Sequence, residues 1–252
     1  MPYRFALSAE DYTDLASGRV FEGSPGHPAF PLRLASEIFQ RCAAIREAPG
    51  DGGPVTVYDP CCGGATLLGA VAYLHGESIG RVVGSDVDAG ILPLAVRNLD
   101  LLTVEGIERR IVELGELVRR FGKDSHRQAL KSAERMRRRI EYLRRVRALT
   151  TRVFSADVLT PAALGPQLAS EHIDVVITDV PYGSGSTWSV PASVRGSPIQ
   201  AMLESLLPFL TPRSVVAISA DKKQPVGDGA FRRLERFQIG KRRVEILGPD
   251  SR

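Results

Sequence analysis

The chain has 252 residues, of which 43% are hydrophobic and 25% are charged, and its formal net charge is +4. This hydrophobic content is ample for a packed core, and no apolar run approaches the ~18 residues of a membrane span. We therefore expect no membrane association.

Cysteine and histidine usage indicates no metal site. The three cysteines are an odd number and two of them, Cys61 and Cys62, are adjacent. This arrangement matches neither a disulfide framework nor a metal-binding Cys-x-x-Cys pair, and the four histidines are scattered. The N-terminus has no basic-then-apolar signal pattern, so we expect a cytoplasmic protein, and we expect a monomer.

Strands alternate with helices through most of the chain. Residues 1–50 predict an N-terminal helical extension, with a helix over 32–45. The strands expected after it cover 55–58, 81–85, 151–155, 173–178 and 214–219, with helices over 66–75 and 89–101. A final hairpin over 231–247 turns near Gly240. This order predicts a single α/β domain over 1–252, with a doubly wound, mostly parallel seven-stranded sheet and an antiparallel C-terminal hairpin strand.

A glycine pair follows the first expected strand in the run Asp59-Pro-Cys-Cys-Gly-Gly-Ala-Thr66. Gly63 and Gly64 allow a ligand to approach the backbone closely, and the helix that follows offers unpaired N–H groups to an anion. The run is neither a dinucleotide fingerprint nor a P-loop. An ordinary strand–helix turn is the alternative.

Aspartates also follow the second and third expected strands. Asp86 is suitably placed to accept both hydroxyls of a ribose, whereas Asp88 is expected to cap the helix that begins at Ala89. Asp157 follows the third strand, and its alternative role is that of a solvated loop residue. Carboxyl ends of parallel strands are where open α/β sheets bind their ligands.

The run Asp179-Val180-Pro181-Tyr182 follows a β-branched strand. It combines a carboxylate, a backbone carbonyl and an aromatic ring, which could hold a planar base by its exocyclic amine. A strand that ends in a proline turn is the alternative. Gly183 to Thr187 would form a flexible substrate-gating loop, and Trp188 is a second candidate to contact a base.

A basic helical insertion is expected over 105–149. It contains 14 of the 33 lysine and arginine residues, and its second half has too few acids to neutralise them. Apolar residues at 3–4 spacing would pack that half on the core, which leaves arginines to contact phosphates. The candidates are Arg135, Arg138, Arg139 and Arg145. A solvated helix face is the alternative.

The strand-end motifs resemble those of S-adenosylmethionine-dependent methyltransferases with a Rossmann-like fold. The Asp179 to Tyr182 run is similar to their Asn/Asp/Ser-Pro-Pro-aromatic motif, from which it departs at Val180. Together with the arginine-rich insertion, the whole chain resembles the avilamycin-resistance rRNA methyltransferases of actinobacteria. The resemblance implies catalytic roles for Asp179, Pro181 and Tyr182. It also implies the following cofactor-binding residues: Asp59, Cys61, Gly63, Gly64, Thr66, Asp86, Val87, Asp157 and Val158.

The resemblance implies methylation of a guanine in 23S ribosomal RNA and resistance to avilamycin-type antibiotics. We expect the exocyclic amine to be the acceptor, S-adenosyl-L-methionine to be the cofactor, and 23S rRNA or a ribosomal subunit to be the partner. Two alternatives stay open: a DNA-amine or protein-glutamine N-methyltransferase, and a non-catalytic RNA-binding protein on the same scaffold.

Overall fold

The computed structural model describes residues 3–8, 11–16, 18–23, 30–46, 53–181, 188–191, 194, 196–222, 224, 226 and 229–250. Within them, seven strands form one sheet in the order β3-β2-β1-β4-β5-β7-β6. The strands are β1 (Val55–Asp59), β2 (Ile79–Asp86), β3 (Thr150–Ser155), β4 (Ile173–Asp179), β5 (Leu210–Asp221), β6 (Phe231–Ile239) and β7 (Arg242–Pro249).

The first five strands are parallel and the last two form an antiparallel hairpin, which confirms the predicted fold class. The hairpin turns at Gly240, whose φ of +61° favours glycine. The central strands are buried on both faces, because helices cover the sheet on each side, and this explains their continuous β-branched sequence.

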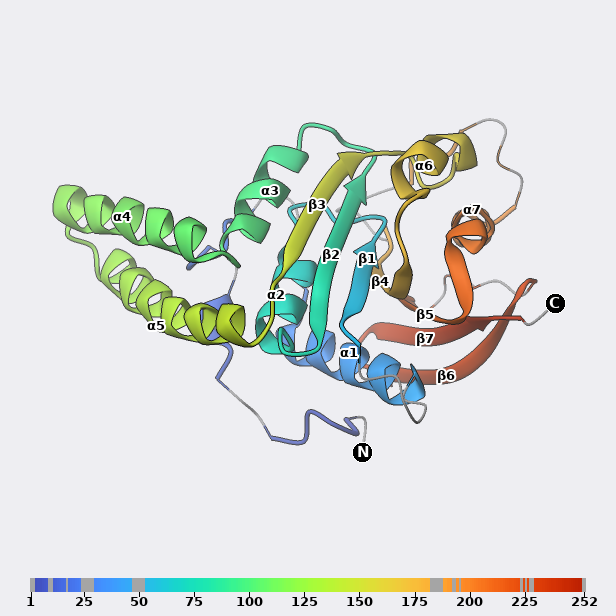
Figure 1. Ribbon diagram of the computed structural model, residues 1–252, viewed down its shortest axis with the longest axis horizontal. Helices are drawn as coiled ribbons and strands as arrows, with labels where there is room; N and C mark the ends of the chain where they lie inside the picture. Colours follow the sequence, from blue (N-terminus) through green and yellow to red (C-terminus); the bar gives the residue numbers. More distant parts are fainter. Residues whose placement is uncertain are drawn as a thin grey trace.

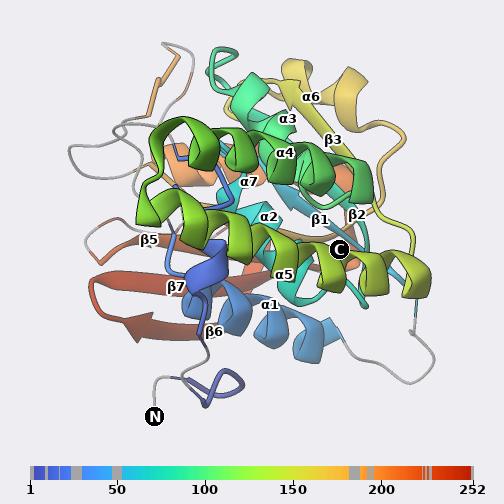
Figure 2. The ribbon, with the colours of Figure 1, turned by 90° about the vertical axis from the view of Figure 1, so that its left-hand side faces the viewer.

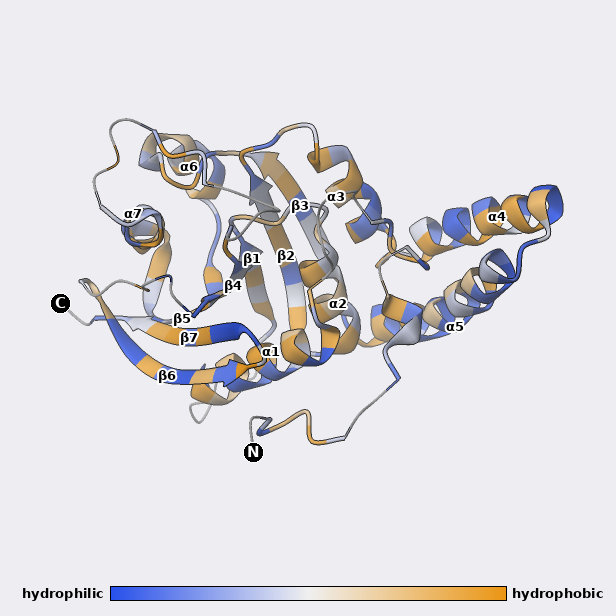
Figure 3. Cartoon of the chain, turned by 180° about the vertical axis from the view of Figure 1, so that it is seen from behind, coloured by the Kyte–Doolittle hydropathy of each residue, from blue (hydrophilic) through white to orange (hydrophobic). Residues whose placement is uncertain are grey.

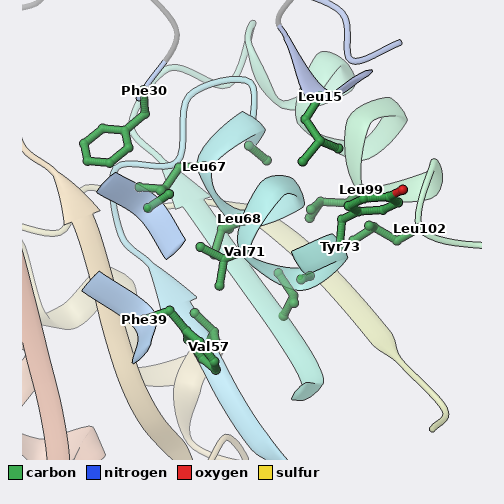
Figure 4. Packing of buried hydrophobic residues seen from close by; sticks show 14 of the residues in the cluster. Leu15, Phe30, Phe39, Val57, Leu67, Leu68, Val71, Tyr73, Leu99 and Leu102 are labelled. Carbon is green, nitrogen blue, oxygen red and sulfur yellow. The ribbon is translucent and has the colours of Figure 1, made fainter. Parts of the chain in front are cut away.

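Two hydrophobic cores lie on opposite faces of the sheet. One contains residues of α1 (Leu32–Arg46), α2 (Thr66–Leu74) and α3 (Leu92–Asp100), and Figure 4 shows part of its packing. The other contains residues of α6 (Pro161–Leu168) and α7 (Pro198–Leu206). The chain therefore winds over both faces, as expected of a doubly wound sheet (Figure 1).

The predicted insertion forms a hairpin of two long helices, α4 (Val104–Phe121) and α5 (Asp124–Val146). Thr103 begins it by accepting the N–H of Gly106 at 2.9 Å, and Gly122 ends α4 with a φ of +57°. The hairpin projects sideways from the sheet beyond β3 (Figures 1 and 2). Both helices show hydrophilic and hydrophobic residues side by side in Figure 3, as amphipathic helices do.

The N-terminal segment packs against α2, α3 and α5. Phe21 is buried against Gly69 of α2, where an added Cβ would lie 2.5 Å from the Phe21 ring. Asn98 of α3 accepts the N–H of Glu22 at 2.8 Å and donates to the Glu22 carbonyl at 2.9 Å. A 3-10 helix, Thr13–Leu15, lies in the same N-terminal segment and contacts α5.

Local details differ from the sequence prediction at three places. The helix expected from Ala89 begins at Leu92, and Asp88 accepts the Gly90 N–H in the preceding turn instead of capping the helix. α6 and α7 were not predicted, because each is short and α6 contains Gly165 and Pro166, which usually interrupt a helix. β5 is longer than expected at both ends.

Candidate active site

Four aspartates lie at the carboxyl ends of parallel strands, as the sequence predicted. Asp59 ends β1, Asp86 ends β2 and Asp179 ends β4, while Asp157 follows β3 by two residues. β1 pairs with β2 on one side and with β4 on the other. Helix α2 after β1 and helix α7 after β4 lie on opposite faces, so β1 and β4 flank the topological switch point, where such sheets bind ligands.

The glycine loop after β1 is held against the end of β2. Gly63 has a φ of +50°, and its N–H donates to Asp86 Oδ2 at 2.8 Å. A Cβ added at Gly63 would meet nothing within 4 Å, whereas one at Gly64 would lie 3.1 Å from Leu94. The loop is thus open at Gly63 and packed at Gly64. Thr66 follows as the first residue of α2.

Asp59 is a buried carboxylate that is only 2% exposed. Its Oδ1 accepts the Cys61 N–H at 3.0 Å, and no lysine or arginine of the described residues forms an ion pair with it. Burial, reinforced by the charges of Asp86 and Asp179, raises the pKa of Asp59 to about 7. The neighbouring aspartates make the electrostatic potential at Asp59 negative, which suits a cationic ligand.

The two neighbouring thiols are unsuited to nucleophilic chemistry. Burial, with the charges of Asp59 and Asp86, raises the pKa of both Cys61 and Cys62. Both are therefore protonated at neutral pH, and only the thiolate is a strong nucleophile. A mechanism through a cysteine adduct is accordingly disfavoured here.

The ends of β2 and β3 form the adjoining part of the site. The Ala156 N–H donates to the Asp86 carbonyl at 3.1 Å, which joins the two loops. Val87 is 54% exposed, whereas Val158 is 4% exposed and belongs to the core. Asp157 accepts the Leu159 N–H at 2.9 Å and the Thr160 hydroxyl at 3.1 Å, so its carboxylate also shapes its own loop.

The end of β4 carries the candidate catalytic carboxylate. Asp179 is about one quarter exposed, and its Oδ2 lies 3.6 Å from Nη2 of Arg242. Val180 is buried and its N–H donates to the Ser219 carbonyl at 3.0 Å, which fixes the backbone before Pro181. Tyr182 and the expected gating loop 183–187 lie outside the described residues. Trp188 packs against the core on the α6–α7 side.

Two residues of the site were missed from the sequence. Asn98 donates to the Gly64 carbonyl at 2.8 Å in addition to its two bonds with Glu22, so this buried amide fixes the glycine loop. Arg242 reaches the site from the antiparallel hairpin. An asparagine inside an amphipathic helix could have signalled the first. The basic run at 241–243 marks the hairpin as cationic but does not show that Arg242 reaches the aspartates.

The four candidate RNA-binding arginines on α5 differ in their contacts. Arg135 forms an ion pair with Asp14, and Arg139 donates to the carbonyls of Tyr73 and Leu74 at 3.1 and 2.9 Å. Arg138 and Arg145 are exposed and, in the described part of the chain, form no ion pair. Lys131, Arg138 and Arg145 follow one another at steps of seven residues, which is close to two helical turns, so they share one face of α5. We call these three residues the basic stripe.

The basic stripe runs towards the amino ends of the strands. Arg147, just after α5, donates to the Glu77 carbonyl before β2, and residues 146–148 line a hollow with Pro54 and Gly80. The candidate active site lies at the opposite end of β2, whose eight residues span about 23 Å. Arg145 is therefore distant from the four aspartates.

The described residues contain no cluster of His, Cys, Asp and Glu side chains that could hold a metal ion. None of the described helices is long and apolar enough to cross a bilayer. The fold, the glycine loop and the four strand-end aspartates together define an α/β methyltransferase.

The comparisons identify the family. The model of the AviRa rRNA methyltransferase family matches residues 1–242. The chain is 42% identical over 245 residues to a 23S rRNA (guanine(2535)-N(1))-methyltransferase from Streptomyces viridochromogenes, covering 97% of this chain and 95% of that protein. Two structures of rRNA methyltransferase AviRa from that organism superpose with TM-scores of 0.85 and 0.87, at 42% and 40% identity. Each comparison covers 98% of this chain and 96% of the other. The chain belongs to the AviRa rRNA methyltransferase family.

The charge state of Asp59 predicts how stability depends on pH. The ordinary pKa of 3.8 rises to about 7 in the folded protein, so between these values the folded state binds more protons than the unfolded state. The free energy of unfolding should therefore fall as pH rises, by at most about 1.4 kcal/mol per unit from this group. Asp59→Asn should remove this dependence, as urea unfolding at pH 5 and pH 8 would measure.

The exposed Asp88→Asn variant is the control, and its stability should track that of the wild type at both values. If Asp59→Asn changes the free energy of unfolding by the same amount at pH 5 and at pH 8, Asp59 is ionised over this whole pH range in the folded protein.

Proposed function

We propose that this chain uses S-adenosyl-L-methionine to methylate N1 of a guanine in 23S ribosomal RNA, and that this modification gives resistance to avilamycin-type antibiotics. The proposal is supported by family membership and by the relative whose name states that reaction. The Asp179 motif favoured the exocyclic amine, but the relative is named for the ring nitrogen, and the proposal follows the relative. The reaction would take place in the cytoplasm, where ribosomes are.

The single structural observation that carries cofactor binding is the buried carboxylate at the switch point, beside an open glycine loop and a second strand-end aspartate. The cofactor carries a sulfonium and an ammonium group, which complement the negative potential that Asp86 and Asp179 produce around Asp59. When bound, it supplies an electrophilic methyl group. Asp86 is suited to bind a ribose diol, because each of its oxygens accepts only one backbone N–H and has capacity for another hydrogen bond. Oδ2 accepts from Gly63 and Oδ1 accepts from Asp88.

We assign the remaining cofactor contacts by position in the loops. Gly63 offers open space at the amino-acid end, next to Cys61 and Thr66. The exposed Val87 side chain is suited to contact the cofactor on the ribose side. Asp157 and the backbone at Val158 would lie at the adenine.

Methylation at N1 requires that the N1–H bond of guanine be broken. The carboxylate of Asp179 is partly exposed and ends β4, which pairs with β1, the strand that precedes the glycine loop. It is therefore placed to accept this proton from a flipped-out base. The backbone at Pro181 would position the base, and Tyr182 would stack on it, a contact worth about 1–3 kcal/mol.

RNA affinity would depend on phosphate contacts along the basic stripe. Lys131, Arg138 and Arg145 extend over about 21 Å of α5, and the half-exposed Tyr142 lies on the same side, four residues after Arg138. Arg135 and Arg139 are occupied by internal contacts, so we expect them to hold α5 in place as well as to add positive charge.

The cofactor site predicts the first variant. Asp86→Ala should weaken S-adenosylmethionine binding tenfold or more, since a charge-assisted hydrogen bond contributes about 1.5–3 kcal/mol. Isothermal calorimetry would measure the affinity, with Asp88→Ala as the control that leaves it little changed. Unaltered binding by a folded Asp86→Ala protein would remove Asp86 from the site.

The chemistry predicts a second variant. With radiolabelled S-adenosylmethionine, the wild type should label 23S rRNA, and mass spectrometry should find the methyl group on guanine N1. Asp179→Ala should lower the single-turnover rate by about 10²–10³, the usual scale for a lost transition-state contact. Cofactor affinity should be little changed.

The same assay distinguishes the alternatives. Preferential labelling of duplex DNA or of protein would contradict the proposed substrate, and absence of labelling despite tight RNA binding would favour a non-catalytic binder. Near-normal transfer by Asp179→Ala would exclude Asp179 as the proton acceptor.

The basic stripe predicts a third result. Replacing Lys131, Arg138 and Arg145 by glutamine should weaken RNA binding and reduce the slope of log affinity against log salt by about 2, since each phosphate contact contributes about 0.7. Cofactor affinity should be unaffected. Arg232→Gln, an exposed change on β6, is the control. An unchanged slope in the triple variant would mean that the stripe is only a solvated helix face.

A further inference from the structure

Arg242 is a cation brought to the candidate active site by the reversal of the sheet. It is the first residue of β7 and pairs in register with Asp221, the last residue of β5. Because β7 is antiparallel to β5, its first residue lies at the carboxyl edge of the parallel strands, level with the aspartates. A parallel strand would have placed its first residue at the opposite edge.

Contacts on two sides hold the Arg242 side chain. Its guanidinium carbon lies 5.2 Å from the centre of the Phe30 ring, a cation–π distance, and its Nη2 lies 3.6 Å from Asp179 Oδ2. Phe30 is buried beside Leu67, in the first turn of the helix that follows the glycine loop (Figure 4). The Arg242 side chain remains 22% exposed.

Asp179 and Arg242 together complement one edge of guanine. That edge carries the N1–H donor next to the O6 acceptor, and a carboxylate accepts from the first while a guanidinium donates to the second. We propose that Arg242 binds O6 of the target guanine and thereby selects the base and stabilises its anion. This inference rests on the proposed N1 methylation.

The movement of charge during the reaction supports this role. As the N1 proton passes to the Asp179 carboxylate, the carboxyl group becomes neutral and the electron pair of the N1–H bond stays on the base. The resulting negative charge is shared between N1 and O6. Arg242, which balances Asp179 beforehand, then faces the charge on O6, so it stabilises negative charge at both stages without moving far.

The same contact would discriminate against adenine. Adenine has an amino group in place of O6, so this group and the guanidinium would both be hydrogen-bond donors. Adenine also has no proton on N1 to donate to the Asp179 carboxylate, so Arg242 and Asp179 would both be left unsatisfied. A site built to hydrogen-bond one group rejects an analogue that lacks it much more strongly than an apolar pocket does. Arg242 would therefore be a specificity residue that also acts in the chemical step.

The test uses the whole protein with a 23S rRNA fragment that contains either guanosine or 6-thioguanosine at the methylated position. At saturating RNA and cofactor, Arg242→Gln should lower the single-turnover rate about 10²-fold, with cofactor affinity retained, and Arg242→Lys should recover part of the loss. Sulfur accepts hydrogen bonds weakly, so the rate ratio between the oxygen and sulfur substrates should be severalfold smaller in Arg242→Gln than in the wild type. The effect of sulfur on N1 acidity cancels in this comparison.

Arg232→Gln is the matched control and should leave both the rate and the ratio unchanged. An equal oxygen-to-sulfur ratio in wild type and Arg242→Gln would overturn the inference. So would a variant with a normal rate at saturation but a salt slope reduced by about 0.7, which would make Arg242 a phosphate contact. If Arg242→Gln does not fold, the ratio is measured on Arg242→Met, whose unbranched side chain carries no hydrogen-bond donor. Failure of the proposed function would appear separately, as wild-type protein that does not place a methyl group on guanine N1.

Discussion

The burial of Asp59 at the switch point of the sheet is the constraint on which the site depends. A carboxylate taken out of water is costly unless it is neutralised or hydrogen-bonded, and here one backbone N–H donates to it while two further aspartates lie close by. A fold selected only for stability would place an apolar residue there. The retained charge is therefore best understood as a requirement of the ligand, whose positive charge would offset the cost on binding.

The rest of the site is arranged around this aspartate by the topology of the sheet. The glycine loop must bend away from β1 with left-handed conformations at Gly63 and Ala65, and the Gly63 N–H then reaches Asp86 at the end of the neighbouring strand. Asn98 fixes the other side of the loop and connects it to the N-terminal segment. The loop is thus rigid on both sides before any ligand binds, which reduces the entropic cost of binding.

The sequence was sufficient to predict the alternation of strands and helices, the terminal hairpin and the edge of the sheet where the aspartates meet, because all of these follow from local patterns. The contacts of Arg242 and Asn98 could not be predicted, since each connects segments far apart in the chain. The same limit applies to α5. A charge run does not reveal that Arg135 is paired with Asp14, or that Arg139 holds the end of α2 through two carbonyls.

The distance between the basic stripe and the aspartates bears on the kind of RNA that this fold could bind. Arg145 lies near the amino ends of the strands and the target base would lie at their carboxyl ends, so one RNA that contacted both would have to follow the side of the domain along β3. A short unstructured strand would lose much entropy in holding that path, whereas a folded RNA presents distant phosphates and one extruded base at fixed separation. An enzyme with this layout would derive affinity from the shape of its substrate and would leave the choice of base to the few groups around Asp179.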